Sequence, residues 1–176
     1  LEERPGAWVF CLHDFSTGAT KEIAKSDRQV NSLAYDGVFL AWTSLSGDGQ
    51  HLYAQRVSTG QRWELAQSAV LGSSAAVGRA LSVHEGRVVW EVPEERGRRG
   101  GSIWMHDMAT GASKCLVASS DRAKGTDPCI WGNTVVWVEI RSGPDRSTTQ
   151  STFQLFALDL ATGEKRRLSD PCYCIR

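Results

Sequence analysis

Hydrophobic and polar residues alternate over short stretches along most of the chain, and turn residues separate these stretches. The clearest unit is residues 103–116, which reads as a strand, a Thr-Gly turn and a second strand. Alternation with a period of two between turn residues is typical of β-strands, and the period of an amphipathic helix is absent. The pattern therefore predicts an all-β protein without helices.

Near-copies of this unit recur along the chain. In each copy a branched aliphatic residue follows the turn, and another apolar residue precedes it at a fixed offset. The copies lie about 40 to 50 residues apart, a period that indicates a propeller, a solenoid or an array. The four turn pairs are Thr17-Gly18, Thr59-Gly60, Thr110-Gly111 and Thr162-Gly163.

Two kinds of position in this repeat carry structural expectations. The turn glycines should mostly adopt positive φ, because tight hairpin turns often require it. The apolar positions on the two strands should be buried between neighbouring sheets. These apolar residues are Phe10, Leu52, Ile103 and Leu155 before the turns, and Ile23, Leu65, Leu116 and Leu168 after them.

A second hairpin lies between the copies of the first. Each copy has a two-residue turn signal followed by a β-branched and aromatic run that ends in Trp. One period is therefore two hairpins, or four strands, and the predicted fold class is an all-β propeller of four-stranded antiparallel blades. The turns are Asp36-Gly37, Glu85-Gly86 and Gly132-Asn133, and the tryptophans are Trp42, Trp90 and Trp137.

The inventory of hairpins predicts an incomplete arc. There are four Thr-Gly hairpins and three of the second kind, so about three full blades follow an N-terminal half blade. Unpaired strand edges at both ends would invite self-association. Within a partial propeller over 1–176, the expected parts are a half blade at 8–25, blades at 31–67, 79–118 and 127–169, and the start of a truncated blade at 170–176.

Composition narrows the classes of partner. The 176 residues include 20 basic and 20 acidic side chains, a balance that argues against a broad nucleic-acid-binding surface. No apolar run is long enough to predict a membrane span. Residues 1–5 contain neither an initiator Met nor an apolar signal-peptide core, so we expect a processed chain or a segment of a longer one.

Five cysteines form no zinc-binding pattern. Their odd number argues against a framework of structural disulfides. Cys172 and Cys174 have half the spacing of a metal site but no matching second pair, and we interpret the cysteines as small buried residues on strands. The five are Cys11, Cys115, Cys129, Cys172 and Cys174.

Strand direction places the short turns of both hairpins at one end of the blades and the longer connections at the other. Variable loops on a rigid scaffold are where binding usually occurs. We therefore expect a protein partner at the long-loop face, without catalytic residues and without a cofactor. The candidate contact residues are Asp48, Arg96, Arg98, Arg99, Arg141, Asp145 and Arg146.

His13 and His106 occupy the same position in the repeat, and each is followed by Asp. Imidazole is a common metal ligand, so these two residues are the candidates for a metal site. The other two copies have Gln55 and Leu158 at this position. Packing or surface exposure is the alternative interpretation, and we expect no metal.

The segment 156–168 has an aromatic residue, then Asp-Leu-Ala-Thr-Gly, then a basic strand that ends in Leu. Together with hairpins that end in Val-Val-Trp, it resembles the TolB-like propeller repeats. Where those repeats usually carry Ser-Pro-Asp-Gly, this chain has Ala34-Tyr35-Asp36-Gly37 and Val83-His84-Glu85-Gly86. The resemblance implies an extracytoplasmic, protein-binding propeller with no inherited catalytic residues.

Related blades also occur in accessory domains of prolyl peptidases and in some polysaccharide lyases. The alternative is therefore a fragment of a propeller enzyme, or the gating propeller of a serine peptidase or a polysaccharide-degrading enzyme.

Overall fold

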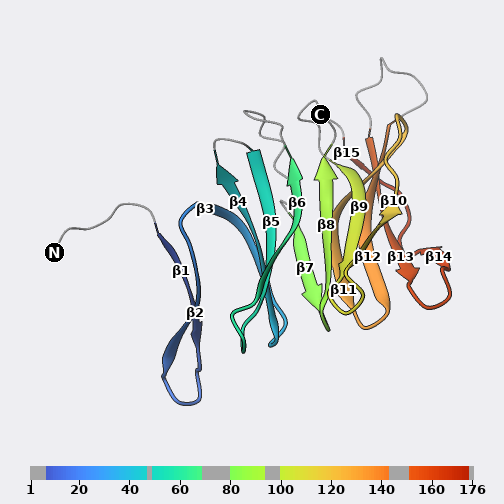
Figure 1. The fold of residues 1–176 in the computed structure, drawn as a ribbon. Helices are drawn as coiled ribbons and strands as arrows, with labels where there is room; N and C mark the ends of the chain where they lie inside the picture. The colour runs from blue at the N-terminus through green and yellow to red at the C-terminus, as the bar shows by residue number, and fades with distance from the viewer. Residues whose placement is uncertain (1–6, 47–48, 69–79, 94–99, 143–150, 175–176) are drawn as a thin grey trace.

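The computed structural model describes residues 7–46, 49–68, 80–93, 100–142 and 151–174, and among these no residue is helical. Antiparallel sheets follow one another in a row from the N-terminus to the C-terminus (Figure 1). The half sheet consists of β1 (Trp8–His13) and β2 (Thr20–Ser26). The first sheet consists of β3 (Gln29–Tyr35), β4 (Phe39–Ser46), β5 (Gly49–Arg56) and β6 (Arg62–Ser68).

Two further four-stranded meanders complete the row. The second sheet consists of β7 (Leu81–His84), β8 (Arg87–Pro93), β9 (Gly101–Asp107) and β10 (Ala112–Val117). The third sheet consists of β11 (Ala123–Trp131), β12 (Thr134–Ser142), β13 (Ser151–Asp159) and β14 (Lys165–Arg167). A backbone pairing of Gly125, on β11, with Gly101, on β9, joins these two meanders. The prediction of an all-β chain with four-stranded antiparallel units is confirmed.

Some strand limits differ from the sequence pattern. Residues 25–30 are mostly polar, as in a loop, yet β2 continues to Ser26 and β3 begins at Gln29, so only a tight turn remains. In this turn the Ser26 hydroxyl donates a hydrogen bond to the Arg28 carbonyl oxygen at 3.0 Å. At 170–176, where a further blade was expected to begin, β15 (Cys172–Cys174) pairs with β13 and extends the third sheet.

The residue types of the Thr-Gly unit follow from the hydrogen bonds of its turn. In the second sheet the Gly111 amide donates to the Asp107 carbonyl oxygen at 2.8 Å. The Asp107 carboxylate accepts hydrogen bonds from the amides of Ala109 and Thr110 at 2.8 and 3.2 Å. The Thr110 hydroxyl oxygen accepts one from the Ala112 amide at 3.3 Å. Asp and Thr therefore recur because their side chains satisfy part of the turn backbone.

The turn glycines have the expected conformation. Their φ angles lie in the left-handed region, where a side chain is strained and glycine is not. The prediction of positive φ is confirmed at all four positions. The values are 70° for Gly18, 72° for Gly60, 71° for Gly111 and 75° for Gly163.

We predict that Ser16→Ala raises the pKa of Asp14. The Ser16 hydroxyl and amide donate to the Asp14 carboxylate at 2.6 and 2.8 Å. These bonds, the side-chain one first, lower the pKa of Asp14 from 3.8 to about 2. Because the folded pKa is below the unfolded one, this carboxylate stabilises the fold above pH 3.8 and loses that contribution as the pH falls toward about 2. If an NMR titration gives the same Asp14 pKa in the wild type and in Ser16→Ala, the prediction is wrong.

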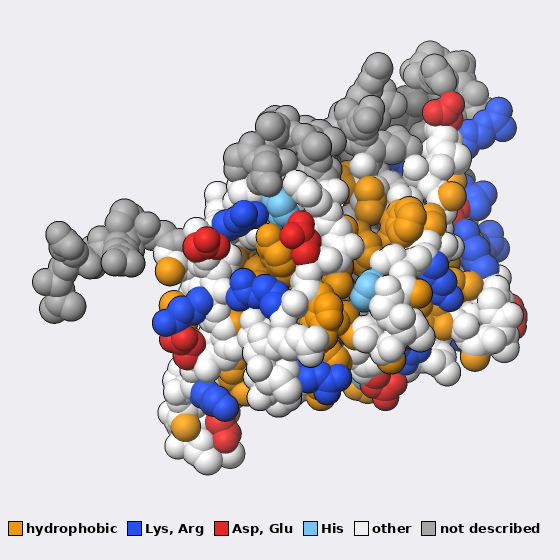
Figure 2. Space-filling view, in the orientation of Figure 1, with side chains coloured by type: hydrophobic (Ala, Val, Ile, Leu, Met, Phe, Trp, Pro, Cys, Tyr) orange, Lys and Arg blue, Asp and Glu red, His pale blue; other side chains and the backbone are white. Residues whose placement is uncertain are grey.

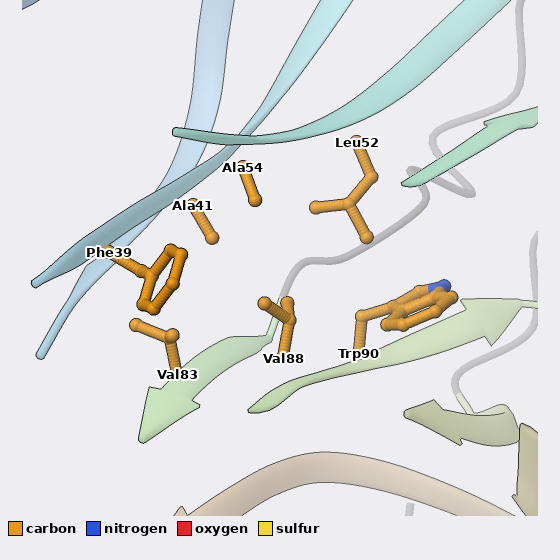
Figure 3. Close-up of a cluster of buried hydrophobic side chains, with 7 residues drawn as sticks. All are labelled: Phe39, Ala41, Leu52, Ala54, Val83, Val88 and Trp90. Carbon is orange, nitrogen blue, oxygen red and sulfur yellow. The ribbon is translucent and has the colours of Figure 1, made fainter. Parts of the chain in front are cut away.

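Three apolar clusters lie between successive sheets. The first contains Phe10 and Ala24 of the half sheet with Leu40 and Trp42 of β4. Figure 3 shows the second cluster, in which side chains of β4 and β5 face those of β7 and β8. The third joins Val89, Ile103 and Met105 to Ile130, Val135, Trp137 and Phe156. Each sheet interface therefore has a hydrophobic core of its own.

The predicted apolar positions are buried only where a following sheet covers them. Phe10, Leu52 and Ile103 are buried, as expected. The prediction is wrong for Leu155 and Leu168, which are 44% and 48% exposed. Leu155 lies on β13 and Leu168 directly follows β14, and no further sheet lies beyond the third sheet among the described residues. The remaining three positions, Ile23, Leu65 and Leu116, are half-buried.

Candidate functional site

An open groove lies between the half sheet and the first sheet. It has a volume of about 500 Å³, and β1 and β3 supply most of its walls. Apolar clefts of several hundred Å³ are the usual sites of ligand and peptide binding. The residues that line it are Trp8, Val9, Phe10, Cys11, Leu12, Ile23, Val30, Asn31, Ser32, Leu33, Tyr35 and Leu40.

Large apolar side chains are exposed in this groove. Trp8 and Leu12 on β1 are 48% and 40% exposed, and Leu33 on β3 is 54% exposed. Single exposed apolar residues are common on protein surfaces, whereas a contiguous group of them marks an interaction site. The deeper wall is the Phe10 and Leu40 cluster, whose members are buried.

A strand edge accompanies the apolar walls. β1 pairs with β2 on one side, and within the described residues no strand pairs with its other side. The corresponding strands of the other sheets, β5, β9 and β13, are each paired with a preceding strand. The edge of β1 therefore offers backbone donors and acceptors directly beside the groove.

The groove contains no charged side chain among its lining residues. The Tyr35 hydroxyl is already satisfied, since it donates to the Gly37 carbonyl oxygen at 2.9 Å. Elsewhere, charges of both signs are interspersed over the face in view in Figure 2. The site therefore suits a neutral, apolar segment that also satisfies the backbone groups of β1.

Of the residues predicted at the long-loop face, the structure describes Arg141. Its guanidinium forms an ion pair with Glu139 at 2.7 Å, and Lys165 contacts the other carboxylate oxygen at 2.7 Å. Burial would raise the pKa of Glu139, but hydrogen bonds from Lys165 and Arg141 outweigh it and hold that pKa below its ordinary value. Arg141 therefore neutralises a carboxylate in the interior. Asp48, Arg96, Arg98, Arg99, Asp145 and Arg146 lie outside the described residues.

A second buried carboxylate lies between the second and third sheets. Glu91 is 7% exposed, and its carboxylate accepts a hydrogen bond from the Thr126 hydroxyl at 2.8 Å. Burial raises the pKa of Glu91, and the nearby charge of Asp127 adds to this effect. Raised carboxyl pKa values are found at many active sites. Among the described residues, however, no group of three or more metal-binding side chains accompanies it.

The two histidines considered for a metal site are on different sheets. His13 Nδ1 is 2.8 Å from the Thr20 hydroxyl on the neighbouring strand, and His106 Nδ1 is 2.8 Å from the Ser113 hydroxyl. The shared repeat position is therefore used for a cross-strand hydrogen bond. Burial lowers the pKa of His106.

The interpretation of the cysteines as buried residues is wrong for those whose exposure is described. They are exposed and free of disulfides. Cys129 contacts the Ser82 hydroxyl at 3.8 Å. The residues concerned are Cys11, Cys115, Cys129 and Cys172.

The part of the chain that the structure describes contains no helix that could cross a membrane. No protein-family model matches the sequence, and no curated protein matches it. The likeness to solved structures is at the level of the fold.

Three solved structures illustrate this likeness. TolB from Acinetobacter baumannii is 17% identical, with a TM-score of 0.58, and the match covers 93% of this chain and 40% of TolB. An oligogalacturonate lyase in complex with manganese is 10% identical, with a TM-score of 0.64 and coverage of 90% and 47%. The β-propeller domain of the Trilobed protease from Pyrococcus furiosus is 10% identical, with a TM-score of 0.57 and coverage of 94% and 54%.

The chain thus has the fold of a partial, TolB-like β-propeller, which confirms the predicted fold class. It spans about half of the length of the structures that it matches. At these identities the likeness shows the fold and no activity.

Sequence reasoning did not find the groove. The inventory of hairpins indicated a half blade before the first sheet, and this was the signal that could have revealed it. A half blade leaves one face of the next sheet uncovered, and that face includes Leu33 and Tyr35. The period-two pattern identifies these residues as strand positions but does not say which sheet lies opposite them.

Proposed function

We propose that the chain is a non-catalytic protein-binding propeller and that it binds a polypeptide segment in the groove between β1 and β3. The observation that supports this is the coincidence of an apolar cleft of about 500 Å³ with a free strand edge. Addition of a strand to such an edge is a common mode of peptide recognition.

Recognition would use two kinds of contact. Backbone groups of the incoming segment pair with the free edge of β1, which gives a sequence-independent contribution. Alternate side chains of the segment then point into the groove, because successive residues of a strand face opposite sides. Burial of Leu33 and Trp8 by these side chains supplies the apolar contribution, roughly 25 cal/mol for each Å² removed from water.

The long-loop face is the other surface on which a partner could bind, as the positions of the longer connections suggest. A selection experiment separates the two surfaces. A library of displayed twelve-residue peptides is selected against the wild-type chain, and the binders are then measured against Leu33→Asp and Arg141→Glu.

We predict that Leu33→Asp weakens the selected peptides at least about tenfold, because a carboxylate in the cleft cannot be desolvated without cost. Arg141→Glu should leave their affinity unchanged. Circular dichroism melting of each variant verifies that it is folded. Binders that are weakened by Arg141→Glu and not by Leu33→Asp would overturn the assignment of the binding site to the groove and would favour the long-loop face.

An accessory propeller of an enzyme is the second candidate function. It is favoured by the fold likeness to the propeller domain of a protease and to a lyase. In that case the groove and the loops would position or gate substrates for a catalytic domain. A hydrolase or lyase domain encoded in the same reading frame as this chain would support this candidate.

A further inference from the structure

We infer that the segment recognised in the groove is a two-stranded β-hairpin with a small, apolar face. This inference rests on the proposed function, and it specifies the class of partner. It follows from a comparison of the groove with the equivalent surfaces of the second and third sheets.

The register of the first hairpin in each sheet defines equivalent positions. In the first sheet Tyr35 on β3 pairs with Leu40 on β4. Val83 pairs with Val88 in the second sheet, and Ile130 pairs with Val135 in the third. Leu40, Val88 and Val135 each precede by two residues the tryptophan that ends the repeat, so these three pairs are equivalent.

The equivalent residues differ in exposure because of what lies opposite them. Tyr35 is 37% exposed, whereas Val83 is 8% and Ile130 is 2% exposed. Figure 3 shows that Phe39 and Ala41, from the hairpin of the preceding sheet, face Val83 and Val88. The groove is thus the uncovered form of a surface that a hairpin covers elsewhere in this chain.

Both strands of a hairpin have a place in the groove. The second strand would pair with β1, as β4 pairs with β5 and β8 with β9. The first strand would lie beside β3, in the way that β7 lies beside β11. There the Ile130 amide donates to the Ser82 hydroxyl at 3.2 Å, and the His84 and Trp131 rings stack at 4.2 Å.

The lining specifies the chemistry of the hairpin. Without charged residues in the groove, an acidic or basic side chain on the inner face would be desolvated without a partner. The faces that cover the equivalent surfaces are apolar, with Phe39 and Ala41 in one case and Val89 in the other. The partner therefore presents aromatic, Ala or Val side chains on alternate residues next to a tight turn.

The experiment uses a backbone-cyclised peptide with the sequence of residues 29–46, which is this chain's own β3–β4 hairpin, as the probe. Isothermal titration calorimetry measures its binding to the full chain. The controls are the same peptide with Phe39→Asp and a linear peptide of residues 39–46. On the protein, Leu33→Asp and Trp8→Ala test the groove, and Trp131→Ala is a matched control at an exposed aromatic outside it.

We expect one-to-one binding of the cyclic hairpin, weakened at least about tenfold by Leu33→Asp in the protein or Phe39→Asp in the peptide, and unchanged by Trp131→Ala. Two results overturn the hairpin inference and leave the proposed function intact. One is that the linear strand binds as tightly as the hairpin. The other is that peptides selected for the groove bind while the hairpin does not.

Two further results would also overturn the inference. If neither the hairpin nor any selected peptide responds to Leu33→Asp, both the inference and the proposed function fail. Sedimentation velocity completes the test. Concentration-dependent association of the chain that Leu33→Asp abolishes would make a second copy the occupant, and the inference of a partner hairpin would then be wrong.

Discussion

Replacing Trp90 with Ala is expected to lower the free energy of unfolding by about 3–5 kcal/mol, the range for deletion of a buried aromatic side chain. Trp90 is 2% exposed and packs against Leu52 and Ala54 across the interface between the first and second sheets (Figure 3). Its removal leaves a cavity that these strands cannot close without breaking their own pairing. Urea unfolding followed by far-ultraviolet circular dichroism measures the loss.

Trp131→Ala is the matched control for this prediction. Trp131 is 77% exposed and contacts the ring of His84, so the same substitution removes little buried area. Its effect should stay within about 0.5 kcal/mol, as for surface substitutions generally. Equal losses in the two variants would contradict the assignment of Trp90 to the interior.

The second large effect is expected for Gly101→Ala. A Cβ atom at Gly101 would lie 1.9 Å from the carbonyl oxygen of Val92 on the paired strand. Neither atom belongs to a side chain that can rotate away, so β8 and β9 must separate locally. Overpacking typically costs about 1–3 kcal/mol, and a clash with backbone places this variant at or above the upper end.

The same segment makes a backbone contact between the second and third sheets. Gly101 pairs with Gly125, where an added Cβ would lie 2.7 Å from the Ile103 side chain. Gly101→Ala should therefore also loosen the junction of the two sheets. Hydrogen exchange at the Gly125 amide, measured by NMR, is expected to accelerate along with the loss of stability.

Gly111→Ala separates this clash from ordinary backbone strain. Gly111 has a φ of 71°, and nothing lies within 4 Å of an added Cβ atom. Its substitution should cost about 1–2 kcal/mol, the strain of a left-handed conformation for an L-residue. A loss for Gly111→Ala as large as that for Gly101→Ala would show that conformation, and not close approach, makes Gly101 necessary.

The repeat alone was sufficient for the fold. The Asp and Thr positions of the turns could be identified because their side chains accept hydrogen bonds from backbone amides within a few residues. The positive φ values at the four turn glycines follow from the same local geometry. The strands between the turns were recognisable because alternation with a period of two is a property of a single strand.

The candidate site could not be predicted from the local sequence pattern in this way. The long-loop residues were chosen because variable loops often bind, yet Arg141 is paired with the buried Glu139. The approach of Lys165 to the same carboxylate brings together strands that are distant in the sequence. The local sequence around Glu139 and around Lys165 does not indicate that the two side chains pair.

Ile103 and Leu155 show that equivalent repeat positions can differ in burial. The two residues occupy the same place in the repeat, yet Ile103 is fully buried and Leu155 is 44% exposed. Ile103 packs in the cluster between the second and third sheets, whereas the third sheet is the last in the row among the described residues. Two equal repeat positions therefore have different surroundings, because only one of them has a sheet beyond it.

By itself, the sequence determined the strands, the turns and the division into four-stranded units, because short-range hydrogen bonds and side-chain alternation set them. Only the tertiary structure decided which apolar faces are covered, which side chains form the groove between β1 and β3, and where glycine is needed for close approach. The physical reason is that burial is a property of the sheet lying opposite, and a residue's own repeat position does not specify whether such a sheet is there.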